Sequence, residues 1–269
     1  MRPMYQIARS PLNIQITVEG KPLPIYTRQD GAFFVEALPG KEFIIEVYNS
    51  GFSRVEVLAS VDGLNTLEKE EANWEKPGMV IPGYQTWKNR GWRLSDKEVS
   101  TFKFEEDKSK SVASKVGKTK NTGIIGLALF REKSFFTLDS PFFPNPYAPY
   151  SSTGSPLIGG VQINTRGVGG SSGYTKSSSS YHVNESSEEI TSRGINISAP
   201  DVATGAGEIV KDKIGTTSWQ RASVTPDFVI QIQYRTRQTL VEMGLISEEP
   251  VAFVNLQDDH ATGYANLLK

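Results

Sequence analysis

The sequence has no cysteine, only two histidines and no long apolar run, and each shortage excludes a class of protein. Without cysteine the chain forms no disulfide, no Cys-ligated zinc site and no thiol nucleophile. It contains no run of about eighteen apolar residues, so no segment is a candidate membrane-spanning helix. The balance of 29 basic and 30 acidic residues argues against a chain that chiefly binds nucleic-acid phosphate or an anionic membrane surface. We therefore expect neither nucleic acid nor membrane as a partner.

The opening residues, MRPMYQIARSPLNIQITV, lack the apolar stretch of a secretory signal peptide. We therefore expect the protein to be made and assembled in a cytoplasm. At 269 residues the chain is long enough to bury a hydrophobic core without covalent cross-links.

Short β-branched and aromatic runs, bounded by Gly, Pro, Asn or charged residues, predict strands throughout the first half of the chain. In the stretch from Thr101 to Glu105 the residues alternate strictly, with both phenylalanines on one face and Lys103 on the other. Gly123 to Phe130 does not alternate, which predicts a strand covered on both faces. Further strands are expected at residues 12–18, 31–36, 42–48 and 53–61. This spacing predicts an all-β fold, an antiparallel β-sandwich resembling a jelly roll.

Two polar segments between the predicted strands are expected to be loops. Asp62 to Pro77 holds one tryptophan in an otherwise polar sequence, with room for one helical turn. Glu105 to Lys120 is rich in lysine and serine, which predicts a solvated hairpin or loop.

A long insertion, residues 136–203, separates this first part from the rest. Ser140 to Tyr150 carries four prolines and four aromatics, and 16 of the 30 residues from Ser151 to Ser180 are Gly or Ser. Ordering a chain costs on the order of 1 kcal/mol per residue. Because such a tract buries little apolar surface of its own, we expect neighbouring subunits to hold it, with Phe142, Phe143, Tyr147 and Tyr150 as the partner-binding anchors.

Residues 204–269 are expected to complete the sandwich and end in a tail, with residues 1–135 forming its first part. The alternation of Phe228, Ile230 and Ile232 predicts a strand. Thr236 is a suitable N-cap for one short helix, and Gly244 suits the position just past its end.

Catalytic and metal-binding motifs are weak in this sequence. Ser171 lies in a formal G-x-S-x-G match, but within the low-complexity tract and without the flanking strand and helix that a nucleophile needs. A metal site drawn from Asp258, Asp259 and His260, or from His182 and Glu185, would lie in predicted loop or tail. We expect no enzyme and no cofactor, and a hydrolase or metal site at these residues is the least favoured hypothesis.

Of the four tryptophans, the three in or beside predicted strands are expected in the hydrophobic core: Trp87, Trp92 and Trp219. Trp74 lies in the predicted polar loop. An alternative stays open, in which Tyr84, Trp87 and Trp92 lie on an exposed sheet face and stack on sugar rings, as in a carbohydrate-binding β-sandwich module.

An ordered set of short segments resembles an uncharacterised β-sandwich family found in bacteria and in phages or other viruses. The segments are Val61 to Leu64, Gly78 to Ile81, Gly91 to Leu94, Phe102 to Phe104, Asn121 to Gly126, Thr204 to Glu208 and Tyr234 to Gly244. The resemblance implies a non-enzymatic surface or virion component and carries no catalytic residue with it.

Composition, insertion and resemblance together lead to one expectation about function. We expect a structural protein of a virus or phage particle: a capsid decoration, cement or vertex component located in the virion. Its partners would be other virion proteins and copies of itself, in a homo-oligomer within a larger assembly.

Overall fold

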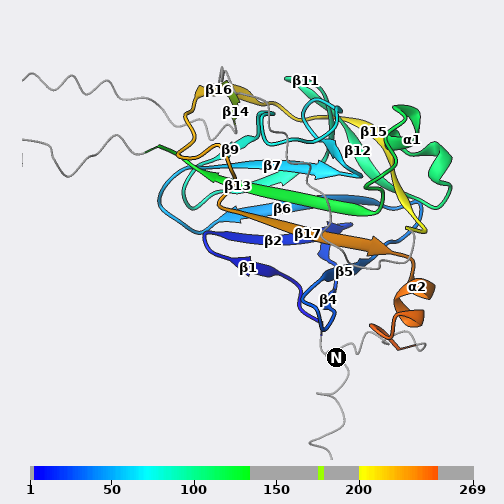
Figure 1. Ribbon diagram of the computed structural model, residues 1–269. Helices are drawn as coiled ribbons and strands as arrows, with labels where there is room; N and C mark the ends of the chain where they lie inside the picture. Colours follow the sequence, from blue (N-terminus) through cyan, green and yellow to red (C-terminus); the bar gives the residue numbers. More distant parts are fainter. Residues whose placement is uncertain (1–2, 134–174, 179–199, 248–269) are drawn as a thin grey trace, which may run out of the picture.

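The computed structural model describes residues 3–133, 175–178 and 200–247, and these form two packed β-sheets with only short helices (Figure 1). One sheet has eight described strands: β1 (Ile7–Arg9), β2 (Leu12–Val18), β3 (Lys21–Pro22), β6 (Glu42–Asn49), β10 (Thr86–Asn89), β11 (Gly91–Ser95), β12 (Glu98–Glu105) and β15 (Ala203–Lys211). The other has nine: β4 (Ile25–Thr27), β5 (Phe33–Glu36), β7 (Val55–Val61), β8 (Leu64–Asn65), β9 (Met79–Ile81), β13 (Ile124–Arg131), β14 (Thr175–Ser178), β16 (Gly215–Ser218) and β17 (Phe228–Arg235). The expected all-β sandwich is confirmed.

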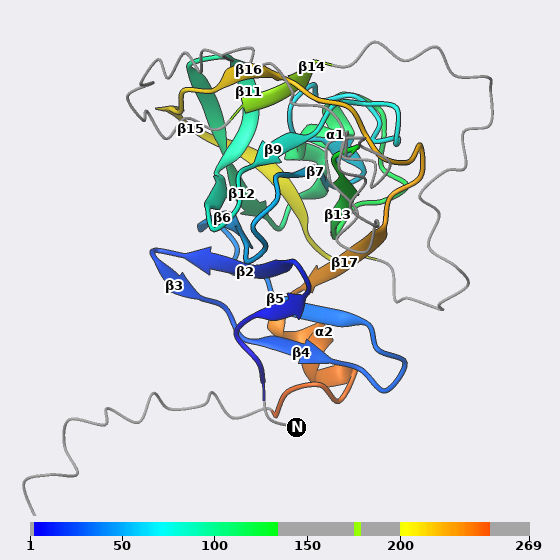
Figure 2. The ribbon, with the colours of Figure 1, turned by 90° about the vertical axis from the view of Figure 1, so that its left-hand side faces the viewer.

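The order of the strands places β14 and β4 at opposite sides of the nine-stranded sheet. The main path runs β16-β14-β9-β7-β13-β17-β5-β4, and in the eight-stranded sheet it runs β1-β2-β6-β12-β11. Most described pairings are antiparallel, and β14 with β16 and β17 with β5 are parallel. Figure 2 shows β14 and β16 at the top of the molecule and β4 and β5 at the bottom.

Alternating strands place their apolar faces in the core between the two sheets. Phe43, Ile45 and Val47 of β6 are fully buried, as the alternation predicts. Phe102 and Phe104 of β12 both stack on Phe43, with ring centroids 5.2 and 4.3 Å apart. These aromatic contacts join the two strands on the inner face of the eight-stranded sheet.

β13 is buried along both faces, as its lack of alternation predicts, because a second apolar layer covers the outside of its sheet. Leu58, Ala128 and Phe130 form that layer, and Trp74 packs against it. Trp74 belongs to the segment expected to be a polar loop. That segment therefore also serves as a cover for the nine-stranded sheet.

Two short helical segments interrupt the stretch from Glu105 to Lys120, so the expectation of a hairpin or plain loop there was wrong. They are η1 (Lys108–Lys110) and α1 (Val112–Lys115). Asp107 and Ser111 act as their N-caps by accepting hydrogen bonds from Ser109 N and Ser114 N. Local capping thus makes a helical turn more favourable here than the polar composition suggests.

The predicted C-terminal helix is α2 (Arg237–Glu242). Thr236 is its N-cap, and Gly244 has a φ of 69°, the left-handed conformation that favours glycine just past a helix. Leu240 and Leu245 pack against Tyr26 and Phe34, so α2 covers the side of the sandwich at β4 and β5. Within the described ranges, no helix is long and apolar enough to cross a membrane.

Candidate functional site: the two bases of the insertion

The chain leaves the sandwich for the insertion at one end of β13 and returns at the other end. It leaves after Arg131, which pairs with Val55 of β7. It returns at Pro200, beside Gly123 at the start of β13, where an added Cβ would lie 2.9 Å from the proline Cβ. A strand rises about 3.4 Å per residue, so the two bases lie roughly 24 Å apart.

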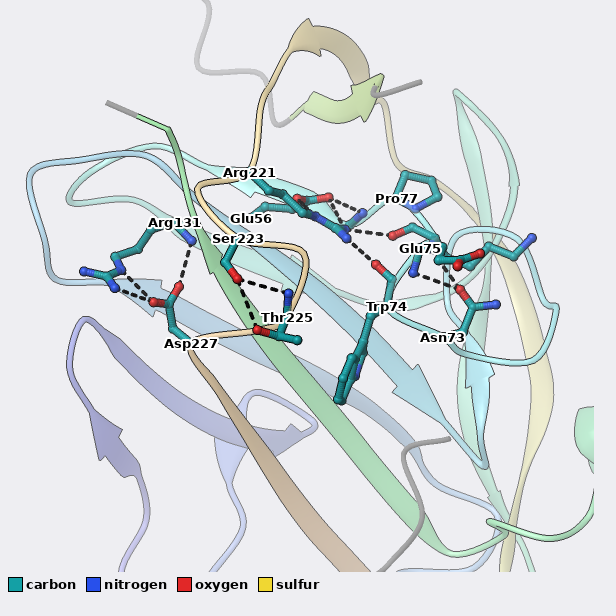
Figure 3. A network of polar contacts seen from close by, with 12 residues as sticks. Glu56, Asn73, Trp74, Glu75, Pro77, Arg131, Arg221, Ser223, Thr225 and Asp227 are labelled. Carbon is teal, nitrogen blue, oxygen red and sulfur yellow. Dashed lines mark hydrogen bonds and ion pairs between the residues drawn. The ribbon is translucent and has the colours of Figure 1, made fainter. Parts of the chain in front are cut away.

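The first base is held by a group of polar residues that we call the exit cluster: Arg54, Glu56, Arg131, Glu132, Arg221 and Asp227. Figure 3 shows four of them, Glu56, Arg131, Arg221 and Asp227. Arg131 donates from its backbone N and its Nε to the Asp227 carboxylate at 3.0 and 2.7 Å. Arg54 Nε donates to Glu132 at 2.9 Å, and its guanidinium lies 5.6 Å from the Trp219 ring. The last residues before the insertion are thus fastened to β7 and to the segment before β17.

The centre of the exit cluster is a buried ion pair. Arg221 Nε and Nη2 donate to the two carboxylate oxygens of Glu56 at 2.7 and 3.0 Å. The side chains are only 5% and 0% exposed. Arg221 also donates to the carbonyls of Trp74 and Lys76. Breaking one half of such a pair is costly because the other charge stays buried.

Close packing around Glu56 depends on a glycine and an aromatic ring. Gly78 N donates to the Glu56 carboxylate at 2.7 Å. A Cβ added at Gly78 would lie 2.7 Å from the Val57 carbonyl oxygen, so only glycine allows this approach. On the other side the Arg221 guanidinium lies 3.8 Å from the centre of the Phe130 ring. The ion pair therefore joins β7, β13 and the segment that covers their sheet.

The second base is held by the return cluster: Asp62, Asp201, Thr204, Tyr234 and Arg235. Asp62 accepts hydrogen bonds from Gly123 N at 2.8 Å, from Thr204 N at 2.7 Å and from the Tyr234 hydroxyl. Burial raises the pKa of Asp62 to about 6, although these three donors oppose the rise. Burial, with the nearby Asp62 carboxylate, also raises the pKa of the Tyr234 hydroxyl. Thr204 lies just after the chain returns from the insertion. The Asp62 carboxylate thus connects Thr204 to the start of β13 and to β17.

A tight turn places the Asp62 side chain. Asp62 and Gly63 have φ values of 52° and 79°, and they connect β7 to β8 through the paired residues Val61 and Leu64. Positive φ at both central residues is typical of a type I′ hairpin turn, which favours Asp-Gly. The turn orients the carboxylate toward the backbone N–H groups of Gly123 and Thr204.

Asp201 connects the return point to α2. Its carboxylate accepts from Thr236 N at 3.1 Å, from Thr239 Oγ1 at 2.5 Å and from the Thr236 hydroxyl. Partial burial alone would raise its pKa, but the hydrogen bonds from Thr236 and Thr239 lower the pKa below its ordinary value. Asp201 therefore fastens the helix to the first described residues after the insertion.

Replacing Asp201 with alanine should destabilise α2 in particular, because its first turn loses three hydrogen bonds. We expect a loss of about 1–2 kcal/mol in the free energy of unfolding and faster amide hydrogen exchange in residues 237–243. Gln238→Ala is the matched control, since it removes only an exposed contact with Glu242. Equal exchange rates in the D201A and Q238A proteins would contradict this role.

One short strand from within the insertion joins the nine-stranded sheet. β14 pairs in parallel with all of β16 and antiparallel with Val80 and Met79 of β9. Fixing four residues costs about 4–8 kcal/mol, whereas six paired positions at roughly 0.5–1.5 kcal/mol each return about 3–9 kcal/mol. The two quantities are of similar size, so β14 is held without a large energetic margin.

Of the residues singled out from sequence, most lie outside the described ranges. These include the anchors Phe142, Phe143, Tyr147 and Tyr150, the serine and histidines considered for catalysis, and the acidic residues considered for a metal. Among the described residues, no group of three or more His, Cys, Asp or Glu side chains could hold a metal ion. Glu56 and Asp62 are buried and bonded to donors, so they position backbone and do not present a base to a substrate.

The tryptophans are mainly core residues. Trp87, Trp92 and Trp219 are 4%, 0% and 6% exposed, which confirms the expectation for these three, and Trp74 is partly buried. The alternative that placed Trp87 and Trp92 on an exposed sheet face was wrong, because Trp92 packs edge-on against Phe102. Tyr84 is exposed, as is Phe52, and the loops that carry them are joined by a hydrogen bond from Tyr84 N to Gly51 O.

A separate cleft of about 450 Å³ lies beside the turn before β6. Its lining includes Glu19, Lys41, Glu42, Arg90 and Thr101. Lys41 Nζ bonds to Glu19 at 2.7 Å and the Thr101 hydroxyl bonds to Glu42. Four of these five polar side chains thus form two pairs within the lining.

The sequence contained a signal for one cluster and none for the other. The dipeptide Asp62-Gly63 between two apolar runs predicts a hairpin turn, although not the buried contacts of its carboxylate. Glu56 and Arg221 are 165 residues apart, and nothing in the local sequence of either residue indicates its partner. Comparison with protein-family models, curated proteins and solved structures finds no match for this chain.

Proposed function

We propose that this protein is a structural component of a virus or phage particle, acting as a capsid decoration, cement or vertex protein through protein–protein contacts. The observation that carries the proposal is the fastening of both bases of the insertion to the sandwich by buried polar clusters. A long segment that binds neighbouring subunits needs firm attachment to the sandwich, because any force on the segment acts on its two bases. The resemblance to a β-sandwich family of bacteria and viruses supports the same proposal.

In this proposal the sandwich is the body and the insertion is the arm that binds other virion proteins and copies of itself. Aromatic side chains with few rotatable bonds make effective interface anchors, and extended backbone adds readily to sheet edges. Phe142, Phe143, Tyr147 and Tyr150 are the proposed anchors. Exposed Phe52 and Tyr84 are further apolar groups for such contacts.

Limited proteolysis of the full chain tests the proposal directly. Trypsin cleavage after Arg166 and Arg193 should be much slower in the assembled protein than in the dilute monomer, because neighbours would cover the arm. Cleavage after exposed Lys97, in the turn between β11 and β12, serves as the control. Equal cleavage of residues 140–200 in both states would refute the proposal.

An arm-deletion variant gives a second test. Residues 134–199 are replaced by a Gly/Ser linker of about twelve residues, which is long enough to join bases roughly 24 Å apart. We expect a folded sandwich that stays monomeric in sedimentation, at concentrations where the full chain self-associates. Self-association as strong as that of the full chain would show that the arm is dispensable.

The carbohydrate-binding alternative now depends on Tyr84 alone among its three proposed residues, since Trp87 and Trp92 are buried. Phe52 is also exposed, in the neighbouring loop, and supplies a second ring for a surface that stacks on sugars. A glycan array probed with the intact protein and with the Tyr84→Ala variant decides this alternative, which requires binding that the substitution abolishes.

A further inference from the structure

β14 fills a gap between two strands of its own chain. β9 lies on one side of it and β16 on the other, at one side of the nine-stranded sheet (Figures 1 and 2). Among the described strands, β16 pairs only with β14. We call this position the strand slot, defined by Met79–Ile81 and Gly215–Ser218. A strand in the slot can form backbone hydrogen bonds along both of its edges.

Both sides of the slot also have contacts with the sandwich that do not involve β14. β9 pairs with β7 in the centre of the sheet, and Met79, Val80 and Ile81 are all buried. β16 is held by the exit cluster, because Arg54 bonds to Thr217 and lies against the ring of Trp219, next to β16. Removal of β14 would therefore leave unpaired backbone groups along β9, with residues 215–218 still held nearby through the contact of Thr217 with Arg54.

The chain on either side of β14 is long enough to carry the strand to another molecule. Forty-one residues separate Lys133 from Thr175, and twenty-one separate Ser178 from Pro200. Fully extended, these lengths reach at most about 140 Å and about 70 Å. Both exceed the roughly 24 Å between the two bases of the insertion.

We propose that the strand slot also accepts residues Thr175–Ser178 from a second copy of this chain, so that neighbouring copies exchange this strand. This proposal rests on the proposed function and specifies which contact joins the copies. The identical strand reproduces both registers, with Thr175 opposite Gly215 and Val80 and Lys176 opposite Thr216 and Met79. The narrow energetic margin of the strand in its own chain favours exchange when copies are crowded together.

Disulfide trapping tests the exchange, because the cysteine-free chain gives no background. Two single-cysteine variants, Lys176→Cys and Thr216→Cys, are mixed at high concentration and oxidised. Residues 176 and 216 are paired in the sheet, so exchange should yield a disulfide-linked dimer containing one chain of each kind. Its yield should be at least tenfold higher than for Lys176→Cys mixed with Gln29→Cys, whose cysteine lies in the exposed turn between β4 and β5, at the opposite side of the nine-stranded sheet.

A second pair protects the test against a variant that fails to fold. Ser178 and Ser218 are also paired, two residues further along the strands, and Ser218 is exposed. Ser178→Cys mixed with Ser218→Cys therefore forms the second pair. Circular dichroism confirms folding of each variant before mixing. Chains that carry both cysteines of one pair show whether the disulfide can form within a single chain. If they form it, but the mixed single-cysteine chains give a yield no higher than the Gln29→Cys control in both pairs, the exchange is overturned.

The outcome for exchange is independent of the outcome for the proposed function. Sedimentation of the wild-type chain and the proteolysis comparison report whether the protein assembles through its arm. Assembly with no cross-chain disulfide would refute only the exchange. Cross-chain disulfides in a protein that shows no protection of its arm would support the exchange and refute the particle role.

Discussion

Replacing Arg221 with alanine is expected to lower the free energy of unfolding by about 3–5 kcal/mol, the largest effect of any single substitution considered for this protein. The Glu56 carboxylate would remain fully buried without its partner, and the carbonyls of Trp74 and Lys76 would lose their donor. Urea-induced unfolding followed by intrinsic fluorescence measures the loss, since Trp74 and Trp219 lie close to the ion pair.

Arg131 of the same exit cluster provides a matched control. Arg131 pairs with Asp227 much as Arg221 pairs with Glu56, but its side chain is 71% exposed (Figure 3). Exposed pairs contribute about 0–1 kcal/mol, so Arg131→Ala should change stability only slightly. Similar losses in both variants would contradict the argument from burial.

A double variant separates the cost of an unpaired charge from the value of the pair itself. Glu56→Gln with Arg221→Met removes both charges and keeps an acceptor for Gly78 N. We expect it to be more stable than Arg221→Ala, because no ion remains buried without a partner. A double variant less stable than either single variant would show that the pair itself is strongly stabilising.

The second large effect is a dependence of stability on pH that comes from Asp62. Its pKa is about 6 in the folded protein and close to 3.8 when the chain is unfolded, so the folded state binds the proton more tightly. The resulting stabilisation is fully present below about pH 3.8 and is lost as the pH rises through 6. A difference of about two pKa units corresponds to roughly 3 kcal/mol.

Comparison with Asp62→Asn isolates this contribution, because asparagine does not titrate. The stability of the wild type relative to D62N should fall by about 2.4 kcal/mol between pH 4 and pH 7, measured by urea unfolding at each pH. Asp30→Asn is the control: Asp30 is exposed, and hydrogen bonds from Arg28 and Ala32 lower its pKa, so it titrates below this window. Parallel pH curves for wild type and D62N would rule out the raised pKa.

The strands were predictable because their apolar residues repeat at the period that a half-buried sheet requires. β6, β12 and β17 follow from alternation, and β13 from its absence. The helical turns at η1 and α1 were not predicted, because capping by Asp107 and Ser111 outweighs a composition typical of loops. Local patterns thus indicate which face of a strand is buried but not what covers it.

The candidate site was harder to predict, because it depends on contacts between distant parts of the chain. The sequence around Arg221 does not indicate its role. Only the fold brings its guanidinium to the Glu56 carboxylate and the Phe130 ring. Trp87 and Trp92 were expected in the core, with an exposed sheet face as the alternative, and their burial in β10 and β11 confirms the core. The aromatic anchors of the insertion stay a prediction.

The placement of the two bases also determines how the sandwich would respond to mechanical force. Tension applied through the insertion enters β13 at Arg131, along the direction of the strand, while β7 and β17 flank it in antiparallel ladders. Such a pull shears the ladders, so the hydrogen bonds of both resist together and do not open one after another. Force transmitted through the arm would therefore be shared between the two ladders of β13.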